Sequence, residues 1–238
     1  TGLRIGTIYQ TSQPAHVEVA QRLLSLPARD CRPEPAPTDA VTDEAILAFL
    51  IGQGLRVHAA DELTDALRRI RLLAEYYYKN WRWRDIREHE TRTFLVIPLL
   101  LALGWAEQQL KIELPAPNGR VDIACFPGSY NAEPSDAIVL IETKGFASGL
   151  DYAPEQARSY AQHFKQCQVV LVTNGYCYKT YLRESTGNFS TNPSAYLNIR
   201  DPRGRYPIDP ERVAGALEVL RWLMPTTLSR VHVATARA

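Results

Sequence analysis

The sequence lacks the long apolar run of a membrane protein. Its longest apolar segment, FLVIPLLLALGW, contains a proline and falls well short of the ~20 residues that cross a bilayer. The N-terminal residues show no signal-peptide pattern. We therefore expect a cytoplasmic protein that does not bind membranes.

Neither cysteine nor histidine is arranged as a metal site. The four cysteines show no CxxC pattern, and the five histidines show neither an H-x₃-H nor an HExxH pattern. Three cysteines lie inside apolar, strand-like runs, so we expect buried, reduced thiols. The histidines are expected at the surface. The cysteines are Cys31, Cys125, Cys167 and Cys177.

Charge of one sign is not in excess either. The chain has 27 Lys and Arg against 26 Asp and Glu, a net charge of +1, so any nucleic-acid surface must be local. The segment YYYKNWRWRDIRE, residues 76–88, is the best candidate because aromatic side chains stack on bases and basic ones pair with phosphates. The alternative is a helix end whose rings pack on the core while its basic groups reach water.

Apolar periodicity predicts helices in the first part of the chain, after an irregular start that includes the proline-rich segment RPEPAPTD. Thr42, followed by Asp43 and Glu44, predicts a helix that ends near Gly52 or Gly54. Apolar steps of three and four predict a long amphipathic helix within 59–81. A third helix is expected over 88–103 and a last one within DPERVAGALEVLRWL.

The middle of the chain reads as strands. Five short runs rich in β-branched and aromatic residues are separated by Pro, Gly and Asn. The helical segment APEQARSYAQHF separates the third run from the fourth, which predicts a right-handed β-α-β unit with parallel pairing. The first three runs are expected to form a meander. The runs are AEQQLKIEL, GRVDIACFPG, AIVLIETKGF, CQVVLVTNG and CYKTYLRE. The pattern predicts an α/β fold.

The second and third runs carry charges among buried-looking apolar residues. Glu142 and Lys144 follow the apolar stretch AIVLI, and residues two apart on a strand point to the same side. Asp122 can join them if the two strands are neighbours. Charges on a strand covered on both faces need a reason. The alternative is a solvated face with a weak ion pair, worth ~0–1 kcal/mol.

Two carboxylates and an ammonium at one place fit phosphodiester hydrolysis. Carboxylate oxygens suit Mg²⁺, which leaves positions open for water and phosphate oxygens, and Mn²⁺ is expected to substitute for it. A neighbouring lysine can orient or deprotonate the attacking water.

GRVD followed by ETK resembles the motif of the PD-(D/E)xK nuclease superfamily, with Asp122, Glu142 and Lys144 at the motif positions. QARSY adds a Q-x-x-x-Y element, Gln156 and Tyr160, typical of RecB-like nucleases and of nuclease domains in type I restriction enzyme motor subunits. Without this resemblance, the alternative is that Gln156 is an exposed surface residue and Tyr160 packs on the core. The similarity covers about residues 86 to 184.

The upstream segment EHETRTFLVIPLLLALGW resembles the helix before the core of the same relatives, with Glu88 and Arg92 at matching positions. The resemblance implies that Glu88 faces the metal, with Glu90 as the fallback. Val121 stands where the motif has proline. The sequence contains no G-x-x-x-x-G-K-[ST] P-loop, so the motor of type I enzymes is missing or lies outside it.

The resemblance implies a restriction endonuclease-like core, a mixed central sheet flanked by helices, over residues 86–238, behind a helical N-terminal extension over 1–85. It implies a Mg²⁺-dependent endonuclease that cuts DNA in restriction or phage defence. The implied metal ligands are Glu88, Asp122, Glu142 and the carbonyl of Thr143.

The resemblance also implies roles for the remaining site residues. Lys144 activates the attacking water, Gln156 positions Glu142, Lys144 or a phosphate, and Tyr160 supports the pocket or the nucleic-acid backbone. A ribonuclease or single-strand nuclease of the same fold is one rival, and a non-cleaving binding module is another. The near-neutral charge further suggests a homodimer or a fused recognition subunit.

Overall fold

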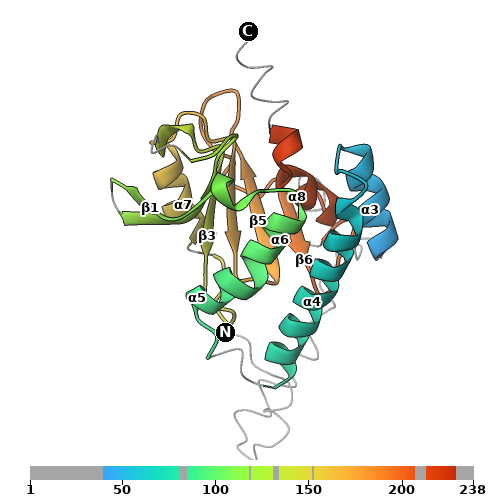
Figure 1. Cartoon of the computed structure of the whole chain (residues 1–238). Helices are drawn as coiled ribbons and strands as arrows, with labels where there is room; N and C mark the ends of the chain where they lie inside the picture. The colour runs from blue at the N-terminus through green and yellow to red at the C-terminus, as the bar shows by residue number, and fades with distance from the viewer. Residues whose placement is uncertain are drawn as a thin grey trace, which may run out of the picture. The chain divides into compact units, whose positions relative to one another are not determined.

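The computed structural model describes residues 40–80, 85–117, 119–130, 134–151, 153–206 and 213–228, all within one compact unit (Figure 1). Predictions for residues 1–39, for Arg82 and Arg84, and for residues 209–212 lie outside these ranges. The last helix, expected to include Val213, begins only at Ala216, and residues 213–215 before it are not helical. None of the helices within them combines the length and the apolar character needed to cross a bilayer.

Two helices precede the sheet, as the periodicity predicts. Helix α3 (Asp43–Gly52) is capped by Thr42, whose Oγ1 accepts a hydrogen bond from the amide of Ala45 at 3.2 Å. Helix α4 (Ala59–Lys79) buries one apolar stripe and exposes its charged side. The buried stripe contains Leu63, Leu67, Ile70 and Ala74. Both predicted helices are therefore confirmed.

The third helical segment is continuous but not regular. Its parts are α5 (Glu88–Thr91), the π-helical turn η2 (Arg92–Val96) and α6 (Ile97–Ala102). The amide of Ile97 donates to the carbonyl of Arg92, which widens the turn directly before Pro98. Proline has no N–H and its ring crowds the preceding turn, so a widened turn accommodates it.

Six strands form one mixed sheet in the order β1-β2-β3-β4-β5-β6. Only β3 and β4 pair in parallel, so the predicted meander and the predicted β-α-β unit are both confirmed. Strand β6 is short and was not predicted. The strands are β1 (Leu110–Ala116), β2 (Gly119–Cys125), β3 (Val139–Thr143), β4 (Val169–Thr173), β5 (Cys177–Leu182) and β6 (Ala195–Asn198).

Helices cover both faces of the sheet. Helix α7 (Ala153–Ala161) packs on β3 and β4, while α8 (Ala216–Trp222) packs on β5 and β6. The core is accordingly split into two buried clusters, one on each face. Figure 1 shows α6 in front of the sheet and α7 behind it.

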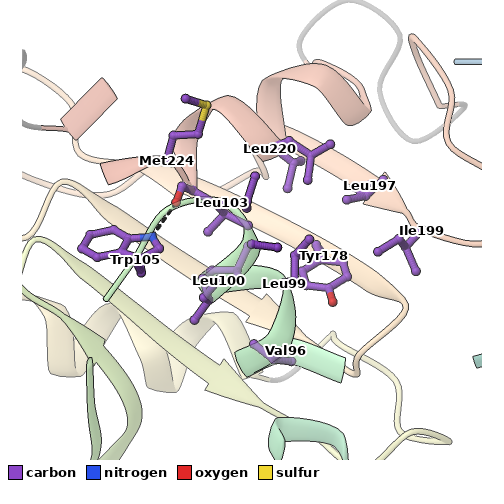
Figure 2. Close-up of a cluster of buried hydrophobic side chains, with 14 of the residues drawn as sticks. Val96, Leu99, Leu100, Leu103, Trp105, Tyr178, Leu197, Ile199, Leu220 and Met224 are labelled. Carbon is purple, nitrogen blue, oxygen red and sulfur yellow. Dashed lines mark hydrogen bonds between the residues drawn. The ribbon is translucent and has the colours of Figure 1, made fainter. Parts of the chain in front are cut away.

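The larger cluster joins the N-terminal helices to the sheet. Helix α4 packs on α6 and α3 on α8, and their buried side chains belong to the same cluster as those of β3 and β5. Figure 2 shows its centre, where Trp105 donates from Nε1 to the carbonyl of Leu223 at 2.6 Å. The predicted domain boundary at residue 85 stays a prediction.

The described cysteines are free thiols. Cys125 and Cys167 are fully buried, as expected, whereas Cys177 is only partly buried. Cys31 lies outside the described ranges.

Candidate active site

Carboxylates occupy matching positions on three neighbouring strands. Ile123 of β2 pairs with Ile112 of β1 and with Ile141 of β3. The next position of both registers therefore aligns Glu113, Asp122 and Glu142. Residues directly opposite each other on antiparallel strands point to the same side of the sheet. Asp122 and Glu142 thus meet at the end of the β2–β3 ladder, as the sequence predicts for neighbouring strands.

Glu142 is a buried carboxylate on a fully buried strand. All five residues of β3 are buried, and the side chain of Glu142 is only 6% exposed. Burial raises its pKa, and the nearby charges of Asp122 and Glu88 raise it further. The hydrogen bond from Lys144 opposes these effects without cancelling them. Lys144 therefore compensates the charge of the Glu142 carboxylate only in part.

Lys144 lies between two of the predicted metal ligands. Its Nζ is 2.7 Å from Oε1 of Glu142 and 3.7 Å from Oε1 of Glu88. Burial lowers its pKa, but the hydrogen bond to Glu142 and the surrounding carboxylate charges outweigh burial and raise it overall. Its amide continues the parallel ladder by donating to the carbonyl of Thr173 at 2.8 Å, which holds the residue in place. Lys144 is therefore an ammonium in this arrangement.

Both oxygens of Asp122 accept hydrogen bonds from the protein. Oδ2 accepts from the amide and the Oγ1 of Thr143, at 2.6 and 2.7 Å. Oδ1 accepts from Nη1 of Arg92 at 3.2 Å. Thr143, predicted as a ligand through its carbonyl, is fully buried and fixes the Asp122 carboxylate. The orientation of Asp122 is thus determined by its neighbours on β3 and η2.

Gln156 and Tyr160 lie on α7, over the face of the sheet that carries Asp122 and Glu142. Nε2 of Gln156 donates to the hydroxyl of Tyr160 at 2.9 Å. The hydroxyl approaches the start of β2 so closely that a Cβ added to Gly119 (φ +149°) would lie 2.7 Å from it. The pair thereby fixes α7 against the strand that carries Asp122. A direct role of Gln156 toward Glu142 or Lys144 stays a prediction.

A hollow of about 450 Å³ opens beside the Glu88–Lys144 pair. Glu88 is 53% exposed and lines it. The fallback ligand Glu90 has another use, because its Oε2 accepts from the amide of Arg87 at 3.1 Å and caps the helix. The other lining residues are Ile86, Arg87, His89, Gly145, Ala147 and Ser148.

The aromatic and basic segment 76–88 was expected either to bind nucleic acid or to pack its rings on the core, and the described tyrosines differ: some are exposed and one is packed. Tyr77 packs on Phe146, with ring centroids 5.4 Å apart. Tyr76 and Tyr78 are half exposed, and the ring of Tyr78 lies 3.8 Å from the guanidinium of Arg200. Of the three rings that the structure describes in this segment, that of Tyr77 belongs to the core and those of Tyr76 and Tyr78 remain on the surface.

Glu113 is a site residue that the sequence analysis missed. Oε1 of Glu113 accepts from Nη2 of Arg92 at 3.1 Å, and its Oε2 pairs with Arg120 at 3.3 Å. In the sequence it is the polar residue between Ile112 and Leu114, as in any half-exposed strand. Only the pairing of β1 with β2 brings it beside Asp122.

The donor set fits a hard divalent cation. Carboxylate oxygens are the ligands of Mg²⁺ and Mn²⁺, and the raised pKa of Glu142 marks a place where added positive charge is favourable. Within the described ranges, no three Asp, Glu, His or Cys side chains form a ready-made ligand group. Instead, Arg92 and Lys144 hold the carboxylates. Glu88, Asp122 and Glu142 can supply ligands when these side-chain cations shift aside.

Comparison with known protein families, with curated proteins and with solved structures found no match.

Proposed function

We propose that this protein is a metal-dependent phosphodiesterase, an endonuclease that uses Mg²⁺ to hydrolyse DNA and has the restriction endonuclease-like fold. The observation that carries the proposal is the convergence of Asp122, Glu142 and Lys144 at the end of β2 and β3. The ion pair joins the buried Glu142 of the central strand β3 to the partly buried Lys144 just after it, and such a pair is expensive to maintain for stability alone because both ions lose hydration. The resemblance to the PD-(D/E)xK superfamily supports the same reading and suggests a role in restriction or phage defence.

The residues of the site divide the work. Bound Mg²⁺ supplies an activated water and neutralises charge that develops on the phosphate. Asp122, Glu142 and Glu88 would hold the ion, and Thr143 keeps Asp122 aligned. The raised pKa of Lys144 favours an ammonium that donates to the water or to a phosphate oxygen and orients it for attack. Gln156 and Tyr160 hold helix α7 against strand β2, which carries Asp122.

The substrate approaches from the side of the hollow. Arg87 lines this hollow, and the exposed rings of Tyr76 and Tyr78 belong to the same segment of the chain. Basic groups bind the backbone and exposed rings bind unstacked bases. Because the net charge is only +1, a second copy or a recognition subunit is expected to add affinity.

The test is cleavage by the purified chain with Mg²⁺ or with EDTA. Plasmid DNA, single-stranded DNA and RNA serve as substrates. We expect Mg²⁺-dependent cleavage of DNA and a loss of at least ~10²-fold in Lys144→Ala, the usual size of a proton-transfer or orienting contribution. Lys165→Ala, at an exposed position, is the matched control and should cleave normally.

Each other outcome identifies a rival. Cleavage of RNA or of single strands alone selects the nuclease of different substrate class. Nucleic-acid binding without cleavage selects the non-cleaving module. Cleavage that persists in EDTA, or in Lys144→Ala, contradicts the proposal.

A further inference from the structure

Arg92 is a buried cation shared by two carboxylates. Its side chain is only 8% exposed, and its two terminal nitrogens contact Asp122 and Glu113 separately. Asp122 belongs to the proposed metal site, whereas Glu113 lies one strand further out and is half exposed. The guanidinium thus bridges the site to a carboxylate outside it.

The backbone at Glu113 is adapted to this contact. Glu113 is the described non-glycine residue with a positive φ, +52°, a conformation that side chains other than glycine rarely adopt. It stands opposite Asp122 in the β1–β2 register, and the pairing is interrupted at that position. Such local distortion persists only where surrounding contacts stabilise it, and it is common at functional sites.

We propose that Arg92 is a movable counter-charge and that Glu113 is its second partner. In the cation-free protein Arg92 neutralises Asp122. When a divalent ion binds Asp122, the guanidinium releases Oδ1 and remains paired with Glu113 alone. The inference rests on the proposed function, because it assigns to Asp122 the role of a metal ligand.

The physical reason is the cost of leaving a buried ion unpaired. A divalent ion and a guanidinium repel each other when both contact one carboxylate, so binding weakens one of the two contacts. A buried arginine without an anion is strongly unfavourable. Glu113 removes this penalty because it already contacts Arg92 at 3.1 Å, and Thr143 holds Oδ2 of Asp122 in place meanwhile.

The experiment measures calcium affinity in the full chain without nucleic acid, from the increase in melting temperature as CaCl₂ is added. Glu113→Gln removes the second partner and should raise the half-saturating calcium concentration about fivefold. Arg92→Gln removes the competitor and should lower that concentration, although the calcium-free protein melts earlier because Asp122 has lost its partner. Glu107→Gln, at an exposed position just before β1, is the matched control and should behave as the wild type.

The opposite signs of the two effects distinguish a counter-charge from a structural role, which would weaken calcium binding in both variants. Unchanged calcium affinity in Glu113→Gln, or weaker affinity in a folded Arg92→Gln, overturns the inference while the metal site stands. If Arg92→Gln does not fold, Glu113→Gln decides alone. If calcium does not stabilise the wild type, the proposed function fails together with the inference.

Discussion

At the scale of single residues, Glu142 is a carboxylate whose environment opposes its own charge. Its side chain is buried at the end of a fully buried strand, and burial raises its pKa. A glutamine of the same shape has no charge to desolvate, and Lys144, which is partly exposed, keeps Glu88 as a counter-charge at 3.7 Å. At such a position function and stability conflict, because the carboxylate that the reaction requires makes the folded protein less stable than a neutral side chain would.

We therefore predict that Glu142→Gln abolishes cleavage and yet stabilises the metal-free protein. In EDTA at pH 7 its melting temperature should exceed that of the wild type by about 2–4 °C, which corresponds to about 1 kcal/mol in a chain of this size. Thermal unfolding followed by circular dichroism measures the difference. Glu184→Gln, at an exposed position, is the control and should leave the melting temperature unchanged.

The pH dependence of this difference has a definite sign. Near pH 4, around the ordinary carboxyl pKa, Glu142 is largely protonated in the folded chain and the two proteins should be nearly equally stable. As the pH rises through the raised pKa of the folded state, the folded chain binds more protons than the unfolded chain, so wild-type stability falls relative to the variant. A difference that shrinks toward pH 7 contradicts this account.

At the scale of elements, the helix that carries Glu88 and Arg92 is fixed by the turn between β4 and β5. Gly175 in that turn has a φ of +89°, and a Cβ added there would collide with Leu95 and lie 2.9 Å from Cγ2 of Thr91. The turn and the π-helical segment η2 therefore pack with no space for a side chain. The position of Arg92 depends on this close contact.

Gly175→Ala should destabilise the protein by about 3 kcal/mol, from the left-handed backbone and from overpacking together. Gly187→Ala is a matched control, since Gly187 has a φ of +85° but nothing within 4 Å of the added Cβ. It carries the backbone penalty alone, about 1 kcal/mol. Urea unfolding of both variants measures the two effects. Equal losses of stability would show that Gly175 matters only for its backbone.

At the scale of the whole described unit, one buried thiol lies on each side of the sheet. Cys125 belongs to the cluster under α6 and Cys167 to the cluster under α7. Burial raises the pKa of both thiols, that of Cys167 to about 12. Thiolates react and thiols do not, so both are inert in the folded protein.

We predict that Cys125 and Cys167 become reactive in the same unfolding transition, because both clusters share the strands of one sheet. Iodoacetamide labelling at increasing urea concentrations, read by mass spectrometry, should give one midpoint for both, equal to the midpoint from circular dichroism. Earlier labelling of Cys167 would instead show that the α7 side opens independently.

Local sequence signals predicted most of the fold. The cap at Thr42, the apolar stripe of α4 and the run AIVLIET are patterns that neighbouring residues determine, and each formed the expected element. Strand β6 was missed because it is short and buries only Ala195 and Leu197. The π-helical turn was missed because a proline signals a disturbance in a helix but not its form.

The sequence by itself determined that Glu142 and Lys144 share one side of a strand, since side chains alternate along every strand. Only the tertiary structure decided that Asp122 and Glu113 stand in line with Glu142 and that Arg92 contacts the first two. Register between strands is set by the packing of both faces and by the turns, so it is not encoded within either strand. The three carboxylates come together only because the strands pair in that register.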